Sequence, residues 1–371
     1  MFIGVCGSIC AGKRTIARYL ADHHGFTQLY LNAHIHDMAD TVVDGSLVLS
    51  SSSSLDTIPS DRQRVFATAD GLLDFVTKHW RERWVTTDIL NESLLDMYAR
   101  RPFFLLISVD APLTVRWLRF QAREKHSTTA LIIRASPTTT ASIPSGTITT
   151  FESFAVLSDT HLYDPVTGQY PLLSRAAVRL INTSSSRAHL YATLGKLDLL
   201  NPDRLRPSWD SYFMALASLA AQRSNCMKRR VGCVVVRDKR VVSTGYNGTP
   251  RGLRNCGDGG CGRCNAAAAG SGHALTTCLC LHAEENALLE AGRERLREGD
   301  VVLYCDTCPC LTCSIKIAQV GISEVVYAQG YSMDRETAAV FREAGVRLRQ
   351  FVPPANGLIH LEKPDPYRER D

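Results

Sequence analysis

The sequence has no long apolar run, and no stretch approaches the roughly 18 residues that a membrane-spanning helix requires. Its opening, MFIGVCGSICAGKR, has no basic segment ahead of the apolar residues and leads straight into a glycine motif, so we expect no secretory signal peptide. No internal repeat is visible. These absences favour a globular protein without a membrane partner, in the cytoplasm or the nucleus.

The sequence also has little excess charge. Its 42 Lys and Arg residues oppose 37 Asp and Glu residues, which gives a formal net charge of +5. A dedicated nucleic-acid-binding protein usually concentrates its basic residues in a stripe, and RNA binding would also need an extended basic and aromatic surface. We see neither pattern and expect no nucleic-acid partner. The mild excess suits small anionic ligands equally well.

Cysteine, in contrast, is plentiful. An odd number of cysteines, 13 in a chain without a secretion signal, favours a reducing compartment in which thiols serve as metal ligands. The length of 371 residues argues for two domains, and a hydrophobic fraction of 45% is enough to build a core in each.

The first half of the chain, residues 1–200, alternates strands with helices. This order predicts a parallel, doubly wound α/β sheet. Two Ser/Thr-rich segments, 46–56 and 126–150, interrupt it and are expected to be long loops. Strands are expected at 1–7, 83–90, 102–112 and 177–184, and helices at 14–25, 111–124 and 187–200.

A glycine-rich motif, GSICAGKRT, opens the first of these helices. Gly7, Gly12 and Lys13 fit the G-x-x-x-x-G-K pattern of a phosphate-binding loop, in the strand-to-helix context that such a loop needs. Arg14 stands where the magnesium-binding Ser or Thr belongs, and Thr15 follows one place late. The motif is therefore a degenerate form of the P-loop.

The segment VDAPLTVRWLRFQAR resembles the late strand and helix of small nucleotide kinases or dephospho-coenzyme A kinases. Asp88, at the end of an expected strand, offers an acidic partner to the loop. We expect a P-loop kinase-like domain without kinase activity over residues 1–200. A glycine turn that binds nothing is the competing interpretation.

The pattern changes after the polar, Pro-containing stretch NPDRLRPSWD, and we place a linker at 201–207. A second domain is expected at 208–352, and residues 353–371 are expected to form a loose tail. The second domain begins with an amphipathic helix, followed by strands at 231–238, 240–248, 301–306 and 324–329, with a helix at 281–292 between the two pairs.

Two cysteines and a histidine fall at the starts of two expected helices. Cys310 and Cys313 are spaced C-x-x-C, so they share one helix face and both sulfurs can bind one ion. The helix N-terminus lowers thiol pKa values and thus favours thiolate ligands. His282 adds a third ligand, which leaves a zinc ion one open position for water.

Glu284 lies two residues after His282, in the first turn of the same helix. It can point past the helix end toward that water, whose pKa zinc lowers to about 7, without binding the metal. H-A-E followed by P-C-x-x-C is the signature of zinc deaminases that act on nucleobases. A purely structural zinc site is the competing interpretation, because Cys305 and Cys308 lie close by in the sequence.

Four segments extend this match: AAQRSNCMKRRVGCVVV, STGYNGTPRG, CLHAEENAL and CPCLTC. Through them, the region from about Ser208 to Val352 resembles the deoxycytidylate (dCMP) deaminase family, in the fungal form with a long N-terminal extension. The resemblance implies a cytidine-deaminase-like α/β/α sandwich with a mixed sheet. It also implies hydrolytic deamination of dCMP to dUMP for thymidylate synthesis, with the three ligands above holding zinc and Glu284 moving the proton.

The turn GYNGTPRG has two roles by the same resemblance. Asn247 is expected to contact the sugar of the substrate, while Gly245, Tyr246, Asn247 and Gly248 bind regulatory nucleotides with Mg²⁺. The resemblance implies that dCTP activates and dTTP inhibits, and it suggests a homo-oligomer, often a hexamer. From the residues alone, a plain hairpin turn is the simpler interpretation. One or two of the basic residues before the first strand of this domain could bind the 5′-phosphate, since arginine offers a bidentate guanidinium. The candidates are Arg223, Lys228, Arg229 and Arg230. We choose Arg223, and a solvated basic face is the alternative for most of them.

A second cysteine-rich region precedes the helix that begins near His282. Its C-x-x-C pair lies in a Gly-rich segment, a form that often folds around zinc. Reduced buried thiols without a metal are the alternative. We expect a structural zinc held by Cys256, Cys261 and Cys264, with His273, Cys280 or Cys226 as the fourth ligand.

The sequence therefore predicts a zinc-dependent dCMP deaminase behind a degenerate P-loop domain. The rival interpretations are a related zinc deaminase acting on a nucleoside or on RNA adenosine, and a nucleotide-binding regulatory protein with an inactive deaminase half. The complete set of His282, Glu284, Cys310 and Cys313 argues against an inactive protein.

Overall fold

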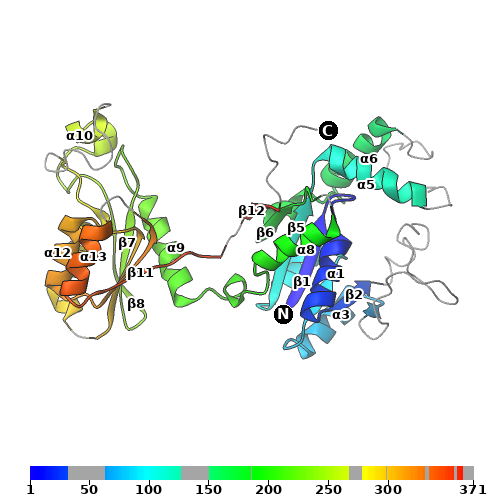
Figure 1. The fold of residues 1–371 in the computed structure, drawn as a ribbon, viewed down its shortest axis with the longest axis horizontal. Coiled ribbons are helices and arrows are strands. Elements are labelled where there is room, and N and C mark those ends of the chain that lie inside the picture. The colour runs from blue at the N-terminus through cyan, green and yellow to red at the C-terminus, as the bar shows by residue number, and fades with distance from the viewer. Residues whose placement is uncertain are drawn as a thin grey trace. The chain divides into compact units, whose positions relative to one another are not determined.

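The computed structural model forms two compact units, Met1–Arg206 with Pro354–Asp371, and Pro207–Pro353. Figure 1 shows the helices and strands of each unit. The Ser/Thr-rich segments expected to be loops, apart from residues 126 and 150, lie outside the described residues. The structure describes residues 1–31, 63–126, 150–184, 186–266, 278–297, 299–330, 334–354 and 357–361.

The first unit contains a seven-stranded sheet in the order β12-β6-β5-β1-β4-β2-β3. All of its strand pairings are parallel, which confirms the predicted sheet type. The strands are β1 (Phe2–Gly7), β2 (Thr27–Leu31), β3 (Gln63–Phe66), β4 (Trp84–Thr86), β5 (Phe104–Asp110), β6 (Val178–Ile181) and β12 (Gly357–His360). Among the described residues of this unit, the α-helices are α1 (Lys13–His24), α3 (Ala69–Lys78), α4 (Glu92–Ala99), α5 (Leu113–His126), α6 (Phe151–Tyr163), α7 (Tyr170–Arg175) and α8 (Arg187–Lys196).

Both faces of this sheet are covered, which explains the uninterrupted apolar sequence of β1. Side chains alternate between the two faces of a strand. Ile3 and Val5 enter the core formed with α1 and α8, whereas Phe2 and Cys6 enter the core formed with α3, α4 and α7. A strand buried on both faces needs apolar residues at every position.

The end of the chain differs from the expected loose tail. Residues 357–360 form β12, which pairs in parallel with β6 from Gly357 opposite Val178 to His360 opposite Ile181. Leu361 is buried in the core with α1 and α8. The prediction is wrong for this segment because β6 would otherwise expose an unpaired edge, and the short apolar sequence GLIH supplies the missing hydrogen bonds.

The second unit contains a five-stranded mixed sheet in the order β11-β10-β9-β7-β8. Strand β7 is antiparallel to β8 and β9, while β9, β10 and β11 run in parallel. The strands are β7 (Gly232–Arg237), β8 (Arg240–Tyr246), β9 (Val301–Thr307), β10 (Glu324–Gln329) and β11 (Arg347–Gln350). The α-helices are α9 (Trp209–Ala221), α10 (Gly262–Asn265), α11 (Ala283–Ala291), α12 (Leu311–Val320) and α13 (Asp334–Glu343).

The side chains of β7 alternate between the two faces of this sheet, and helices pack against both faces. Val234 and Val236 pack with α9 on one face, and Cys233 and Val235 pack with α11 and α12 on the other. This confirms the expected α/β/α sandwich. Strand β8 lies so close to α11 that a Cβ on Gly245 would come within 2.2 Å of the Ala283 carbonyl oxygen. The sheet therefore fixes the start of α11.

None of the helices in the described part of the chain combines the length and the apolar character that crossing a bilayer requires.

Candidate active site

The starts of α11 and α12 meet beside the sheet and bring three side chains together. His282 caps α11 and Cys310 caps α12, with Cys313 one turn further along α12. Nδ1 of His282 lies 3.3 Å from the Cys310 sulfur and 3.4 Å from the Cys313 sulfur. Tetrahedral zinc, with bonds near 2.0 Å to nitrogen and 2.3 Å to sulfur, separates such atoms by about 3.5 Å. The three residues fit one zinc ion.

The fourth position at this site is not filled by a nearby cysteine. Among the described residues, the group of potential ligands contains His282, Cys310 and Cys313 but neither Cys305 nor Cys308. Three ligands with one position open is the arrangement of catalytic rather than structural zinc.

Contacts outside the ligands hold the two helix starts in place. The backbone N–H of His282 donates to Oε2 of Glu285 at 2.9 Å, and Lys316 on α12 forms an ion pair with the same carboxylate. Thr337 Oγ1 donates to the carbonyl oxygen of Pro309 at 2.9 Å, just ahead of Cys310. Such surroundings orient ligands and are as much a part of the site as the ligands themselves.

A hydrogen bond joins the Cys310 and Cys313 side chains. The hydrogen bond from Cys313 lowers the pKa of Cys310 to about 3, helped by His282 and Thr312. The same hydrogen bond and burial raise the pKa of Cys313. The lowered pKa favours the thiolate of Cys310, which is the form that binds metal.

Glu284 lies next to this group without belonging to it. Its side chain is almost completely buried, with 4% of the residue exposed. Burial raises the pKa of its carboxyl group to about 7, against the opposing effect of His282. A group that titrates near neutral pH can both accept and release a proton during turnover.

The turn after β8 is fastened to its surroundings. The Asn247 side-chain oxygen accepts hydrogen bonds from Val231 N at 2.8 Å and Ser224 Oγ at 2.7 Å, and its nitrogen donates to the Arg229 carbonyl at 2.7 Å. Gly248 pairs with Leu281, the residue before His282. Backbone hydrogen bonds thus join this turn to the start of α11.

Each of the three remaining residues that we expected to act near this turn has its own surroundings. The carbonyl oxygen of Tyr246 accepts from Asn286 on α11 at 2.9 Å. Gly245 is explained by its close packing against α11. Arg223 follows α9 and is exposed.

The second cysteine-rich region forms two overlapping groups of sulfur atoms. The first contains Cys226, Cys256, Cys264 and Cys280, and the second contains Cys261, Cys264, Cys278 and Cys280. The three ligands expected from the sequence are therefore divided, because Cys256 and Cys261 fall in different groups. His273 lies outside the described residues.

The P-loop-like motif of the first unit closes on itself. Gly7 and Gly12 have φ angles of 152° and 114°, which only glycine adopts readily. The Lys13 ammonium donates to the carbonyl oxygens of Gly7 at 2.7 Å and Ser8 at 3.1 Å, and burial lowers the pKa of Lys13 to about 8. Arg14 is exposed and Thr15 is partly buried.

Arginines from α5 reach this loop, which the sequence did not predict. Arg119 donates to the carbonyl oxygens of Ala11, Asn182 and Ser184 at 3.0–3.2 Å, and Arg123 donates to the Cys10 sulfur at 3.7 Å. Arginines repeating every three or four positions in TVRWLRFQAREK are the signal that could have indicated one basic helix face.

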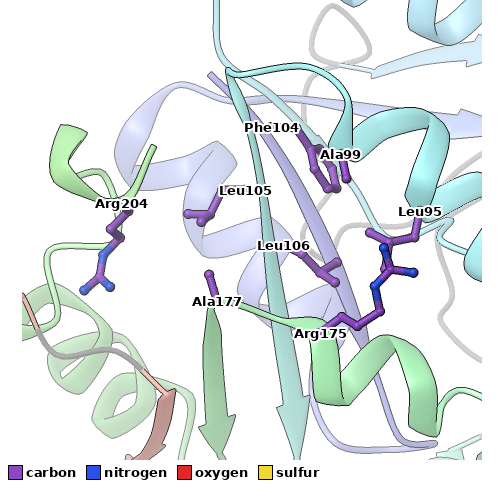
Figure 2. Close-up of a pocket in the computed structure, with 8 residues that line it drawn as sticks. All are labelled: Leu95, Ala99, Phe104, Leu105, Leu106, Arg175, Ala177 and Arg204. Carbon is purple, nitrogen blue, oxygen red and sulfur yellow. The ribbon is translucent and has the colours of Figure 1, made fainter. Parts of the chain in front are cut away.

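A pocket of about 190 Å³ in the first unit lies near the start of β5, away from the P-loop-like motif at the other end of the sheet. Figure 2 shows Arg175 and Arg204 on opposite sides of the strand that carries Leu105 and Leu106. Arg175 pairs with carboxylates on α4, and Arg204 donates to the Leu197 and Asp198 carbonyl oxygens. Ligands of parallel sheets bind at the carboxyl ends of the strands, so we assign no ligand here.

Known proteins resemble this chain, in one case over nearly its whole length. The deoxycytidylate deaminase of Schizosaccharomyces pombe is 45% identical over 358 residues, which cover 96% of this chain and 99% of that protein. This chain belongs to the deoxycytidylate deaminase family. The Saccharomyces cerevisiae deoxycytidylate deaminase is also 45% identical, over 76% of this chain and 85% of that protein.

Two family models each match part of one unit of the fold. The cytidine and deoxycytidylate deaminase zinc-binding region matches residues 207–329, and an AAA domain matches residues 3–135. Human deoxycytidylate deaminase is 34% identical over 41% of this chain and 84% of its own length. The zinc-binding region of the family thus contains the His282, Cys310 and Cys313 group.

Proposed function

We propose that this protein converts dCMP and water to dUMP and ammonia, using zinc held by His282, Cys310 and Cys313. The observation that carries the proposal is the convergence of these three ligands beside the buried carboxyl group of Glu284. A structural zinc site would need neither an open position nor a neighbouring proton carrier. The dCMP substrate follows from membership of the family.

When held by His282, Cys310 and Cys313, zinc would lower the pKa of a water molecule to near 7 and so provide a nucleophile at neutral pH. The Glu284 carboxylate would accept one proton of the attacking water and deliver it to N3 of the cytosine ring, while the water oxygen forms a bond to C4. Glu284 would then pass the second proton of that water to the amino nitrogen, whose bond to C4 breaks, so that ammonia departs and the oxygen remains on C4 of dUMP. Burial favours both transfers, because it keeps the pKa of Glu284 near 7.

The turn at 245–248 and the residues before β7 are our proposed substrate-binding elements. Asn247 uses its side-chain oxygen and one N–H to hold the turn, and we assign its second N–H to the sugar of dCMP. Arg223 is exposed just after α9, and we assign it to the 5′-phosphate.

We further propose regulation at the same turn, with dCTP and Mg²⁺ activating and dTTP inhibiting. Gly245, Tyr246, Asn247 and Gly248 would form the effector site. Because Gly248 is paired with the residue before His282, a movement of the turn reaches the zinc ligands directly. Such regulation requires each effector to bind one state of a homo-oligomer better than another, and a hexamer is the assembly that we propose.

We also propose a second, structural zinc in the cysteine-rich region, because its sulfurs form groups of four.

All 13 cysteines are free thiols. This state suits a reducing compartment, the cytoplasm or the nucleus.

A deamination assay on dCMP, CMP, dCTP and deoxycytidine, with zinc analysis of the same sample, tests the proposal. We expect turnover of dCMP well above that of the other three compounds. Preference for deoxycytidine would indicate a nucleoside deaminase. No turnover of any substrate by zinc-loaded protein would indicate a nucleotide-binding regulatory protein instead.

A further inference from the structure

Six cysteine sulfurs gather beside the start of α11, and we call them the six-sulfur cluster. They come from three separate segments of the chain. The cluster consists of Cys226 after α9, Cys256, Cys261 and Cys264 around α10, and Cys278 and Cys280 before α11. All six are free thiols, and four of them are buried.

The spacing of these sulfurs matches metal coordination. Cys264 lies 3.7 Å from Cys226, 3.6 Å from Cys278 and 3.9 Å from Cys280, measured between sulfurs. Cys261 and Cys278 are 3.9 Å apart. Sulfurs at the corners of a zinc tetrahedron with bonds of 2.3 Å are separated by about 3.8 Å. A disulfide would require about 2.0 Å.

The six sulfurs make two complete sets of four, because Cys264 and Cys280 belong to both. One zinc ion takes only four sulfurs. An ion bound by one set of four leaves two sulfurs of the other set uncoordinated, and these lie within bonding range of a second ion. A cluster of six with two shared members satisfies two tetrahedral ions without any further ligand.

We propose that the six-sulfur cluster binds two zinc ions bridged by the thiolates of Cys264 and Cys280. One ion is completed by Cys226 and Cys256, and the other by Cys261 and Cys278. This inference builds on the structural zinc proposed above and replaces one ion by two.

Each of the four outer sulfurs accepts hydrogen bonds from the chain. N–H groups directed at sulfur stabilise the thiolate form that zinc binds. The donors are the backbone of Lys228 and Arg229 for Cys226, Met227 N at 3.5 Å for Cys256, Leu279 N at 3.4 Å for Cys261, and Arg263 Nη1 at 3.6 Å for Cys278.

The cluster is attached at two points to the turn that we assign to substrate and effectors. Cys226 N donates to Ser224 Oγ at 3.2 Å, and Ser224 Oγ donates to the Asn247 side chain. Cys280 precedes Leu281, which pairs with Gly248. Two bridged ions would therefore hold both sides of this turn and the approach to His282. The described part of this region is short of regular secondary structure, so metal coordination supplies its rigidity.

Zinc content of the unmodified full-length protein, by native mass spectrometry and elemental analysis, is the first test. We expect three ions per chain, one at His282 and two in the cluster. X-ray absorption at the zinc edge should show a zinc–zinc scattering path, which separate mononuclear sites do not give. Two ions per chain without that path would overturn the proposal, as would one ion or an iron–sulfur chromophore.

Two variants and a matched control assign the ions to sulfurs. Cys264→Ala removes a bridge and should lower the zinc content from three to one. Cys226→Ala removes an outer ligand and should cost one ion at most. Cys6→Ala, a buried thiol of the first unit, should keep all three. Equal losses of zinc from Cys264→Ala and Cys226→Ala would contradict shared ligation. If a variant fails to fold, the X-ray absorption spectrum of the unmodified protein decides whether the two ions are bridged.

The dCMP assay on the same samples separates this inference from the proposed function. Two zinc ions with full turnover would overturn the bridged cluster and leave the deaminase intact. Three ions and a zinc–zinc path without turnover would support the cluster and overturn the proposed deamination.

Discussion

In both units, polar side chains of a recognisable motif lie at the start of a helix, but the contacts of these side chains differ. In the second unit, side chains of His282, Cys310 and Cys313 leave their helix starts and converge on one point. In the first unit, Lys13 turns back, and its ammonium is held by the carbonyl oxygens of Gly7 and Ser8. One helix start presents its polar groups to a ligand, and the other uses them to close its own loop.

This difference shows that a motif is defined by what its polar atoms contact as well as by its spacing. The glycines of the first unit still shape a phosphate-type loop, because a Cβ on Gly7 would come within 2.0 Å of the Val109 carbonyl oxygen. The Ala11 carbonyl oxygen of the loop accepts hydrogen bonds from Arg119 and Asn182, which lie outside the loop in the sequence. The loop has thus kept its form and lies in a network of internal hydrogen bonds.

The largest expected effect falls on the second unit. Glu284→Gln should lower kcat for dCMP by roughly 10²- to 10⁴-fold, because the amide preserves the shape of the carboxylate but cannot carry the proton. Steady-state kinetics and zinc analysis measure both consequences. Glu290→Gln, on the exposed side of the same helix, is the matched control and should retain activity. Near-normal turnover by zinc-loaded Glu284→Gln would end the proposed mechanism.

A smaller effect is expected at the turn. A Cβ on Gly248 would lie 2.7 Å from Oδ1 of Asn225, so Gly248→Val should displace the turn. We expect the response of the half-saturating dCMP concentration to dCTP, which in coupled systems is roughly 5- to 150-fold, to be largely lost. Turnover at saturating dCMP should fall less.

Saturation curves with and without dCTP or dTTP check this prediction. Thr244→Val, on the exposed side of β8, is the control and should respond to dCTP as the unmodified protein does. Identical curves for the unmodified protein with and without effectors would show that the turn is not a regulatory site.

The first unit should be the more sensitive to acid. His161 lies 3.3 Å from the Gly7 carbonyl oxygen, and burial together with Lys13 and Arg116 lowers the pKa of His161 to about 4. The unfolded chain binds this proton near pH 6.5, so the free energy of unfolding should fall as the pH drops from about 6.5 to about 4. The loss is on the order of 2 kcal/mol after allowance for partial exposure.

Hydrogen exchange measured by mass spectrometry at pH 7 and pH 5, after correction for the intrinsic pH dependence of exchange, distinguishes the two units. His161→Gln should reduce the acid-induced loss of protection in the first unit. His189→Gln, an exposed histidine of the same unit, serves as the control and should leave it unchanged. Equal acid sensitivity in both histidine variants would show that His161 is not its source.

The smallest effect is expected from Lys13→Ala. It should leave deamination within about twofold, and the free energy of unfolding should fall by about 1 kcal/mol because two loop carbonyls lose their donor. Neither this variant nor the unmodified protein should transfer phosphate from ATP to a nucleoside monophosphate, because Arg14 replaces the magnesium-binding hydroxyl. Kinase turnover that depends on Lys13 would contradict this, and Lys196→Ala is the surface control.

The grouping of His282, Cys310 and Cys313 could be predicted from the sequence because each lies within a short motif at a helix start. The spacing of Cys310 and Cys313 alone places both sulfurs on one helix face. Strand alternation and the apolar run of β1 likewise determine the two sheet types locally. These features depend on neighbours a few residues apart.

Other features depend on contacts between distant segments, which spacing does not reveal. The division of the cysteines into two sets is an example, because Cys226 and Cys278 join it from opposite ends of the region. Helices α3 and α4 were also missed, although Thr68 and Asn91 cap them through their side chains and provide a local signal.

The pairing of β12 with β6 has a consequence for how the protein is made. The first unit is discontinuous in the sequence, since its last strand is translated only after the entire second unit. At roughly 5–20 residues per second, a nascent chain would expose the edge of β6 for on the order of ten seconds. During that interval the edge is open to chaperones, to proteases and to other nascent chains. Completion of the N-terminal sheet therefore has to wait until the whole second unit has been translated.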